Sequence, residues 1–271
     1  VYEGHETAIA TLVSASTHST SLTFGTAAAT GSIVDDGSAN GAGGNFDDDR
    51  PVFSIAPVTV SEGGKAFFTV TRTGDSAVAQ AVQVSTSIAN SDTAATNDFT
   101  AVSNQTLTFA AGVTTQKFYV QTTSDTPFEG RETFTVTLSN ATAGALISST
   151  NGSALGTIAD DGTGTVFNED GTENTTAAPD DDRPTISVEG VSVNEASPFA
   201  IFTVTLSKAS TQPISFTPVL SNGTATVGVD TGNTLEYFDG SRWVSASSGV
   251  TLAAGATRVF LRVAIVQDSV F

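Results

Sequence analysis

The chain has 271 residues, and its 28 acidic against 10 basic side chains give a formal net charge of −18 at pH 7. This charge argues against nucleic acid or an anionic membrane as a partner and makes cations the natural counter-charges. The absence of cysteine excludes disulfides and thiolate metal sites, and no apolar run approaches the roughly 18 residues of a membrane-spanning helix. A bound divalent metal is then the obvious source of added rigidity.

The most informative feature of the chain is that it repeats itself. Three motifs each occur twice. VYEGHET at 1–7 recurs as PFEGRET at 127–133, and GSIVDDG at 31–37 recurs as GTIADDG at 156–162. DDDRP at 47–51 recurs unchanged at 180–184. The run DSVF at 268–271 also matches DTPF at 125–128, so the chain starts and stops at the same point of the repeat. We therefore interpret the chain as a window from a longer tandem array.

The spacing of the motifs predicts the domain organisation. A period of well over 100 residues exceeds the 20 to 50 residues of solenoid repeats, so each unit should be a domain with its own core. The expected parts are the C-terminal half of a unit at 1–36, an acidic and glycine-rich linker at 37–50, a complete unit at 51–162, an acidic linker at 163–183, and the N-terminal part of a third unit at 184–271. The charge of the linkers should extend them unless cations bind.

Within the units, apolar residues alternate with Thr, Ser and Gln. The clearest rows are Phe134, Val136 and Leu138, then Phe202, Val204 and Leu206, then Val259, Leu261, Val263 and Ile265. A period of two indicates half-buried strands, and no useful helical period is present. The sequence therefore predicts an all-β protein of tandem seven-stranded Greek-key sandwiches of immunoglobulin type, with a barrel as the weaker alternative. The first copy has Ala8, Ala10 and Leu12 where the second has Phe134, Val136 and Leu138, so its core must be filled differently.

The complete unit at 51–162 resembles the Calx-beta domain of sodium/calcium exchangers, integrin beta-4 and large bacterial surface proteins. The matching motifs are VSEG at 60–63 (Val60 to Gly63), Asp98-Phe99, LTFAAG at 107–112, the stretch from Asp125 to Asn140, and IADDG at 158–162. They span one whole unit in order. The third segment matches through VNE at 193–195 and GTATVGVD at 223–230 and then departs from the family pattern.

The resemblance implies a calcium site, because acids from separate loops converge at one end of the sandwich in calcium-binding members of the family. The corresponding side chains of the central unit are Glu62, Asp98, Asp125, Glu129, Glu132, Asp160 and Asp161. Calcium takes 6 to 8 oxygen ligands in flexible geometry, which carboxylates at several strand ends can supply. Without metal, such carboxylates repel one another by about 1 kcal/mol per pair in water. Ser124 stands where many members have a second Asp.

The same acids divide between the two incomplete units. The first segment carries Glu3, Glu6, Asp35 and Asp36, and the third segment carries Glu195, Asp230 and Asp268. They are complementary halves of one site, so we expect the C-terminal half of one copy to join the N-terminal half of the next. The junction would be either continuous chain or a subunit contact, and both give a head-to-tail filament.

The acidic runs at 47–49 and 180–182 lie directly before Arg-Pro, at the entry to the next unit. They could close a calcium site from the neighbouring side and so stiffen the joint. The alternative is that these runs are ordinary solvated linker charges.

The residue Leu235 opens a stretch that is foreign to the family pattern, with Tyr237, Phe238 and Trp243 around an Asp239-Gly240 turn. Exposed aromatic faces can stack on sugars, so these three residues are candidate ligand contacts. The alternative is a packed hairpin that covers the sandwich.

The sequence gives no sign of an enzyme. The two histidines, His5 and His18, lie in the first segment, and neither a nucleophile elbow nor a phosphate-binding loop is present. The best-supported function is a calcium-stiffened structural segment of a giant extracellular bacterial adhesin, surface-layer or biofilm-matrix filament protein. Alternatives are a glycan- or protein-binding module that uses the aromatic hairpin, and a non-catalytic domain of a larger enzyme or toxin.

Overall fold

The computed structural model describes residues 2–18, 20–38 and 47–267, and every regular element among them is a β-strand. In this part of the chain no helix is long or apolar enough to cross a membrane. The chain divides into two compact units. The first comprises Val1–Val58, Ala66–Val120 and Phe134–Gly156, and the second comprises Thr59–Lys65, Gln121–Thr133 and Thr157–Phe271. One end of the central sandwich is thus grouped with the third segment.

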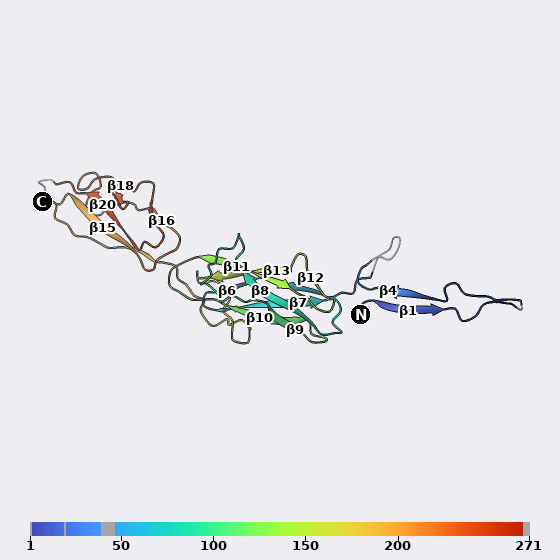
Figure 1. Cartoon of the computed structure of the whole chain (residues 1–271). Coiled ribbons are helices and arrows are strands. Elements are labelled where there is room, and N and C mark those ends of the chain that lie inside the picture. The colour runs from blue at the N-terminus through green and yellow to red at the C-terminus, as the bar shows by residue number, and fades with distance from the viewer. Residues whose placement is uncertain (1, 19, 39–46, 268–271) are drawn as a thin grey trace. The chain divides into compact units, whose positions relative to one another are not determined.

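The first segment is an open hairpin (Figure 1). Strands β1 (Glu6–Thr11) and β4 (Ala28–Ile33) pair antiparallel, with Glu6 opposite Ile33 and Thr11 opposite Ala28. A second, shorter pair joins β2 (Ser16–Thr17) to β3 (Thr20–Ser21). All twelve residues of β1 and β4 are exposed, so this hairpin has no core of its own.

The central unit is a two-sheet sandwich, as the alternation predicts. Its strands are β5 (Val52–Ile55), β6 (Val58–Ser61), β7 (Lys65–Thr73), β8 (Gln80–Ser87), β9 (Gln105–Phe109), β10 (Thr115–Gln121), β11 (Arg131–Ser139), β12 (Leu146–Ile147) and β13 (Ser153–Ala159). One sheet has the order β10-β7-β5-β12 and the other β6-β13-β11-β8-β9. The consecutive strands β5 and β6 lie in different sheets, which ties the two layers together at the start of the unit.

Aromatic side chains fill the core between these sheets. Phe134 of β11 stacks on Phe99 with ring centroids 4.5 Å apart and meets Phe68 of β7 edge-on at 6.0 Å. A side chain on Gly156 of β13 would run into the Phe134 ring, so glycine is required where that ring lies. The row of Phe134, Val136 and Leu138 is buried as predicted. The all-β sandwich prediction is confirmed.

Arg72 is a fully buried cation in this core that no sequence pattern predicts. Its guanidinium donates to the carbonyl oxygens of Val78 at 2.9 Å and Ala110 at 3.1 Å, and to Gln80 Oε1 at 3.0 Å. These bonds hold two loops to the end of β7. The planar guanidinium presents five N–H donors in a fixed geometry, so it can serve several acceptors in its plane at once.

The third segment has a similar strand order but remains open. Its strands are β14 (Ile186–Val188), β15 (Phe199–Leu206), β16 (Ile214–Phe216), β17 (Glu236–Phe238), β18 (Trp243–Ser245), β19 (Val250–Leu252) and β20 (Arg258–Ala264). They form a β14-β15-β20-β17-β18 sheet and a separate β16-β19 pair. A small core surrounds Val204, Ala246, Val250 and Leu261.

Part of the stretch expected as an acidic linker at 163–183 lies against β6. Thr165 bridges Val60, with Ser61 N–H bonded to Thr165 O at 3.0 Å and Thr165 N–H to Thr59 O at 3.1 Å. A Cβ on Gly164 would approach the Val60 backbone to 2.8 Å, so the two segments are in close backbone contact. This path leads the chain to the acidic end of the central unit.

Candidate metal centre

The acidic end of the central unit starts from two neighbouring strands. Glu62 follows β6 directly, Asp160 follows β13 directly, and these strands are adjacent in one sheet. The Glu62 N–H donates to Ala159 O at 2.9 Å, which places the two acids beside each other. Gly63, with φ +72, turns the chain back into β7.

The acidic run at 180–182 lies antiparallel along the residues that follow β13. Asp182 N–H donates to Asp160 O at 2.8 Å, and Gly162 N–H donates to Asp180 O at 2.8 Å. The Asp180 N–H also bonds to Ser61 Oγ at 2.7 Å. These bonds place Asp180 and Asp182 opposite Glu62.

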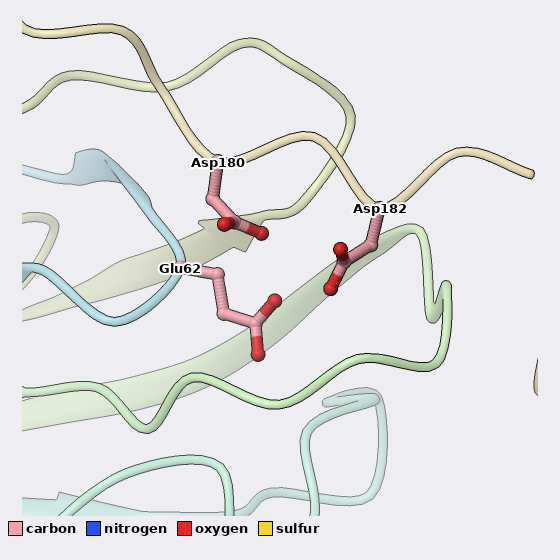
Figure 2. Close-up of side chains that lie close together, drawn as sticks. All are labelled: Glu62, Asp180 and Asp182. Carbon is pink, nitrogen blue, oxygen red and sulfur yellow. The ribbon is translucent and has the colours of Figure 1, made fainter. Parts of the chain in front are cut away.

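Glu62, Asp180 and Asp182 form the first acidic group. One carboxylate oxygen from each lies within 4.8 Å of the others, and Figure 2 shows the three side chains converging from two chain segments. Because successive residues of an extended chain point to opposite sides, Asp181 faces away from them. There it pairs with Arg183 at 2.7 Å, which lowers the pKa of Asp181 to about 2.

The electrostatics of this group favour a cation. Burial, assisted by the neighbouring Asp125, Asp180 and Asp160 carboxylates, raises the pKa of Glu62 to about 7. Burial is also the main cause of the raised pKa values of Asp160 and Asp180, and the Asp182 carboxylate raises both further. Carboxylates packed this closely repel one another unless a proton or a cation lies among them.

Unpartnered oxygens provide a test of whether a metal fits. At this end of the central unit, four buried carboxylate oxygens of the described residues have no hydrogen-bond partner in the protein, which are Glu62 Oε2, Asp160 Oδ1, Asp180 Oδ2 and Asp182 Oδ2. Leaving a buried charged acceptor unsatisfied is costly. Hard carboxylate oxygens from several chain segments are the ligands that calcium prefers, so the residues present fit a calcium ion.

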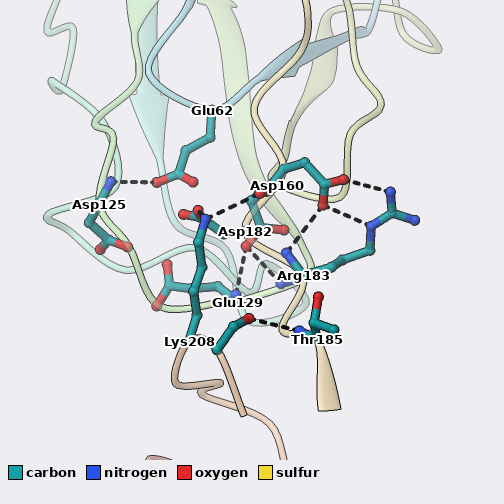
Figure 3. Close-up of polar contacts among 11 residues, drawn as sticks. Glu62, Asp125, Glu129, Asp160, Asp182, Arg183, Thr185 and Lys208 are labelled. Carbon is teal, nitrogen blue, oxygen red and sulfur yellow. Dashed lines mark hydrogen bonds and ion pairs between the residues drawn. The ribbon is translucent and has the colours of Figure 1, made fainter. Parts of the chain in front are cut away.

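Backbone donors fix one oxygen each of Asp160 and Glu62 (Figure 3). Asp160, only 2% exposed, accepts the N–H groups of Glu129 at 2.6 Å and Gly130 at 3.2 Å through Oδ2. Asp125 N–H donates to Glu62 Oε1 at 3.0 Å. These bonds connect the 125–130 loop to the acidic group.

The third segment also reaches the site. Lys208, just after β15, pairs with Asp182 and donates to Asp181 O at 3.2 Å (Figure 3). Phe128 N–H bonds to Ala209 O at 2.8 Å, and Thr211 N–H returns to Phe128 O at 2.9 Å. The acidic end therefore touches the loop that follows β15, a contact that no sequence motif indicated.

A second acidic group consists of Asp98, Glu129 and Glu132, whose ligand atoms also lie within 4.8 Å of one another. Asp98 is buried, and its Oδ2 accepts the Ala95 N–H at 2.5 Å. All three residues are among the calcium ligands that the resemblance to the Calx-beta domain implies.

One predicted residue of the central unit is engaged elsewhere. Asp161 accepts hydrogen bonds from Thr163 and pairs with Arg131 at 3.4 Å. The Thr163 hydroxyl, followed by Arg131, lowers the pKa of Asp161. Among the residues that the structure describes, neither acidic group of three includes Asp125, Asp160 or Asp161, but Asp160 has an unpartnered buried oxygen whereas Asp161 is paired with Arg131.

Among the described residues, the acids of the incomplete units form no group of three like those of the central unit. Glu3 and Glu6 are exposed, Asp35 accepts the Glu3 N–H at 2.6 Å, and Asp36 lies 3.1 Å from His5 Nε2. Bonds from Ser38 lower the pKa of Asp36 to about 2. In the third segment Glu195 is exposed and Asp230 accepts the Thr226 N–H at 2.6 Å, whereas Asp268 lies outside the described residues.

The first segment repeats the backbone pattern of the site. Asp36 and Asp48 form an isolated antiparallel β-bridge, as Asp161 and Asp181 do. The Asp49 N–H donates to Asp35 O at 3.1 Å. Arg50 pairs with Asp48 at 2.8 Å, as Arg183 does with Asp181. The repeated DDDRP motif therefore encodes one local structure twice.

The aromatic candidates pack as a hairpin. Phe238 and Trp243 are opposite each other on β17 and β18 with ring centroids 5.5 Å apart, and Tyr237 packs on the small core. The Arg262 guanidinium lies 4.4 Å from the Trp243 ring centroid and 3.9 Å from that of Phe199. A ligand role for Tyr237, Phe238 and Trp243 stays a prediction.

A model of the Calx-beta domain family matches residues 47–162 and 180–271. These matches cover more than half of the chain, so the chain belongs to the Calx-beta family of calcium-binding domains, whose members are structural or regulatory modules and not catalysts. The family prediction is thereby confirmed.

Solved structures of Calx-beta domains are also similar to the chain. The apo-form Calx CBD1 domain has 27% identity and a TM-score of 0.38 over 41% of this chain and 98% of that one. CBD12 from CALX1.2 has 18% identity and a TM-score of 0.36, and the match covers 81% of this chain and 76% of that one. The calcium binding domain CBD12 of CALX1.1 has 16% identity and a TM-score of 0.38, and the match covers 78% of this chain and 74% of that one. These TM-scores are too low for residue positions to be transferred. No curated protein matches the chain significantly.

Proposed function

We propose that the chain is a calcium-binding structural segment of an extracellular bacterial adhesin, surface-layer or biofilm-matrix filament protein. The carrying observation is the group of Glu62, Asp180 and Asp182, with its unpartnered buried oxygens. Calcium bound there would tie the central unit to the residues that lead into the third segment. Its chemical role is to neutralise the converging carboxylates.

The residues of the chain would divide the work at this site. Glu62, Asp160, Asp180 and Asp182 would supply oxygens, and the backbone N–H groups of the 125–130 loop hold two of these acids in orientation. Extracellular calcium modules bind in the range of about 10⁻⁴ to 10⁻³ M. An affinity in this range would stiffen the protein outside the cell, where calcium is plentiful.

The location and the partners belong to the same proposal. Tandem Calx-beta matches and the recurring DDDRP motif support further copies of the repeat as head-to-tail neighbours, in the same chain or in a neighbouring subunit. Secretion to the cell surface would expose the acidic groups to extracellular calcium. The second candidate function is binding of surface glycans by the aromatic hairpin. It predicts that the unmodified chain binds a glycan array and that Trp243→Ala abolishes this binding, and equal binding by both would contradict it.

Thermal unfolding of the whole chain tests the calcium role. We expect about 10 mM calcium, but not magnesium, to raise the melting temperature relative to chelator. Glu62→Gln and Asp182→Asn should remove most of this rise. Asp161→Asn is the matched control, because Asp161 pairs with Arg131 outside both acidic groups. An equal rise in all variants would refute the site.

A further inference from the structure

A lysine side chain reaches the first acidic group from the loop that follows β15. The ammonium group of Lys208 pairs with Asp182 Oδ1 and donates to Asp181 O at 3.2 Å (Figure 3). Asp182 is only 4% exposed, so the acidic partner of this ion pair is out of solvent. Ion pairs with a buried partner are screened by salt less than pairs at the surface.

Backbone contacts fix the loop that carries this lysine. On one side, the Ser207 N–H donates to Thr185 O at 2.9 Å, and the Thr185 N–H donates to Ser207 Oγ at 2.8 Å. On the other side, Ser210 is 3% exposed and its carbonyl oxygen accepts the Gly255 N–H at 2.8 Å. Lys208 therefore presents its charge at a defined place. A group tethered in this way competes with free ions at a high effective concentration.

The ion pair uses one oxygen of Asp182 and leaves the other available. Asp182 Oδ2 is buried without a hydrogen-bond partner in the protein. Asp182 also belongs with Glu62 and Asp180 to the first acidic group. One ammonium charge cannot balance all the carboxylates of this group. The lysine thus reduces the repulsion among them and leaves a demand for further positive charge.

The lysine is particular to this place in the chain and is not a feature of the repeat. Val70 of β7 and Val204 of β15 hold equivalent places in their sheets. At an equal distance beyond them lie Gly74 and Lys208. The loop after β7 therefore carries no cation at this position. The fold of the unit does not require a lysine here, which indicates a role at the acidic group.

We propose that Lys208 is a tethered counter-cation that stabilises the acidic end in the absence of calcium and competes with calcium for Asp182. The inference rests on the calcium site of the proposed function and gives that site a regulator. Because like charges repel, an ammonium group beside the acids opposes a second cation. The lysine therefore lowers the calcium affinity and at the same time stabilises the calcium-free protein.

This arrangement has a signature that a purely structural residue lacks. Without the ammonium charge, Asp182 would lie unpaired beside Glu62 and Asp180, so the calcium-free protein would lose stability. The same change removes a competitor of the ion, so calcium would bind more tightly. One substitution therefore moves stability and affinity in opposite directions, whereas loss of a merely structural contact would weaken both.

Titration calorimetry of the whole chain with calcium chloride, at fixed ionic strength, measures the affinity. We expect Lys208→Met to bind calcium at least about 10-fold more tightly than the unmodified chain and to melt at a lower temperature in chelator. Lys208→Arg keeps the charge and should stay within about 3-fold of the unmodified affinity. Arg183→Met is the matched control, because it removes the same charge beside Asp181, which faces away from the group. It should change the affinity by less than about 3-fold.

The outcomes separate this proposal from the calcium site itself. An unchanged or weaker affinity of Lys208→Met would overturn the competition and leave the site in place. An equal gain in Arg183→Met would also overturn it, because net charge alone would then explain the effect. If neither the unmodified chain nor Lys208→Met bound calcium, the proposed function would fail and the competition with it.

Amine labelling provides a second readout that needs no substitution. Lys208 should react slowly with an amine-specific acetylating ester in chelator, where it pairs with Asp182. Calcium should raise its labelling at least about 3-fold, because the ion shifts the equilibrium away from the pair. Peptide mass spectrometry measures the labelling relative to Lys117, an exposed residue of β10. Equal labelling of Lys208 with and without calcium would contradict the competition.

Discussion

The central unit and the third segment have corresponding motifs, yet they differ in closure at both the core and the acidic end. The core of the central unit excludes solvent from Phe53 and Phe68, whereas Ile186 at the position of Phe53 is 41% exposed. At the acidic end Glu62 lies beside Asp180 and Asp182, whereas its counterpart Glu195 is exposed. One pair of strands accounts for both differences.

That pair is β11 and β13. Strand β13 carries Ile158 into the core and leads directly into Asp160 at the acidic end. The 125–130 loop, which orients Glu62 and Asp160, leads into β11. Closing the core and assembling the acids therefore depend on the same two strands in the central unit.

The largest expected effect separates the two cores. Phe53→Ala should cost about 3 to 5 kcal/mol, because it leaves a cavity in a closed core, whereas Ile186→Ala should cost about 1 kcal/mol or less at a half-exposed position. Far-UV circular dichroism follows both units during denaturation, and the single tryptophan, Trp243, reports only on the third segment. A Phe53→Ala variant that shifted the tryptophan transition as strongly as the dichroism transition would contradict this separation.

The second prediction compares the acidic ends. With an affinity of about 10⁻⁴ to 10⁻³ M, 10 mM calcium should stabilise the central unit by about 1.4 to 2.7 kcal/mol. Glu62→Gln should remove this gain, and Glu195→Gln, at the corresponding position of the third segment, should leave it intact. Denaturation in calcium and in chelator measures both. A loss of the gain in Glu195→Gln would show that the third segment also binds the ion at these concentrations.

A third prediction concerns the aromatic hairpin of β17 and β18, which belongs to the third segment and has no match in the motifs of the central unit. Arg262 lies between the Phe199 and Trp243 rings and pairs with Glu236 at 2.7 Å. Arg262→Ala should destabilise the third segment by about 1 to 2 kcal/mol through lost cation–π contacts and packing. Trp243 fluorescence during denaturation measures the loss. Arg258→Ala, at an exposed position on the same strand, should change little.

Much of this architecture could be predicted from the sequence, because strand alternation and repeated motifs are local signals. The burial of Phe134, Val136 and Leu138 follows from the period of two, and the family follows from motifs such as VSEG and IADDG. The acids of the central unit could be named in the same way. Which of them lie together depends on contacts between distant segments, which local patterns do not encode.

Two residues show where that limit falls. Asp161 matches the family motif as well as Asp160 does, but the path of the chain points it towards Arg131 and Thr163. Lys208 carries no motif, yet the loop after β15 brings it to Asp182. The Asp180 to Asp182 run did hold a usable signal, because the alternation of an extended chain separates Asp181, beside Arg183, from its two neighbours.

The smallest expected effect is a pH dependence that belongs to the acidic end of the central unit alone. Burial raises the pKa of Glu62 from 4.5 to about 7 in the folded protein. Between these values the folded state binds more protons than the unfolded state, so in chelator the stability should fall as the pH rises from 4.5 through 7. Asp160 and Asp180, whose pKa values are also raised, act in the same direction.

Melting temperatures from pH 5 to pH 8 in chelator, followed by far-UV circular dichroism, measure this slope. Glu62→Gln should flatten the slope, because it removes the group that titrates. Asp161→Asn should keep it, since the pKa of Asp161 is lowered and that side chain is ionised throughout the range. Calcium replaces the proton among the carboxylates, so the gain from calcium should grow as the pH rises. A gain that shrank towards pH 8 would mean that these carboxylates do not receive the ion.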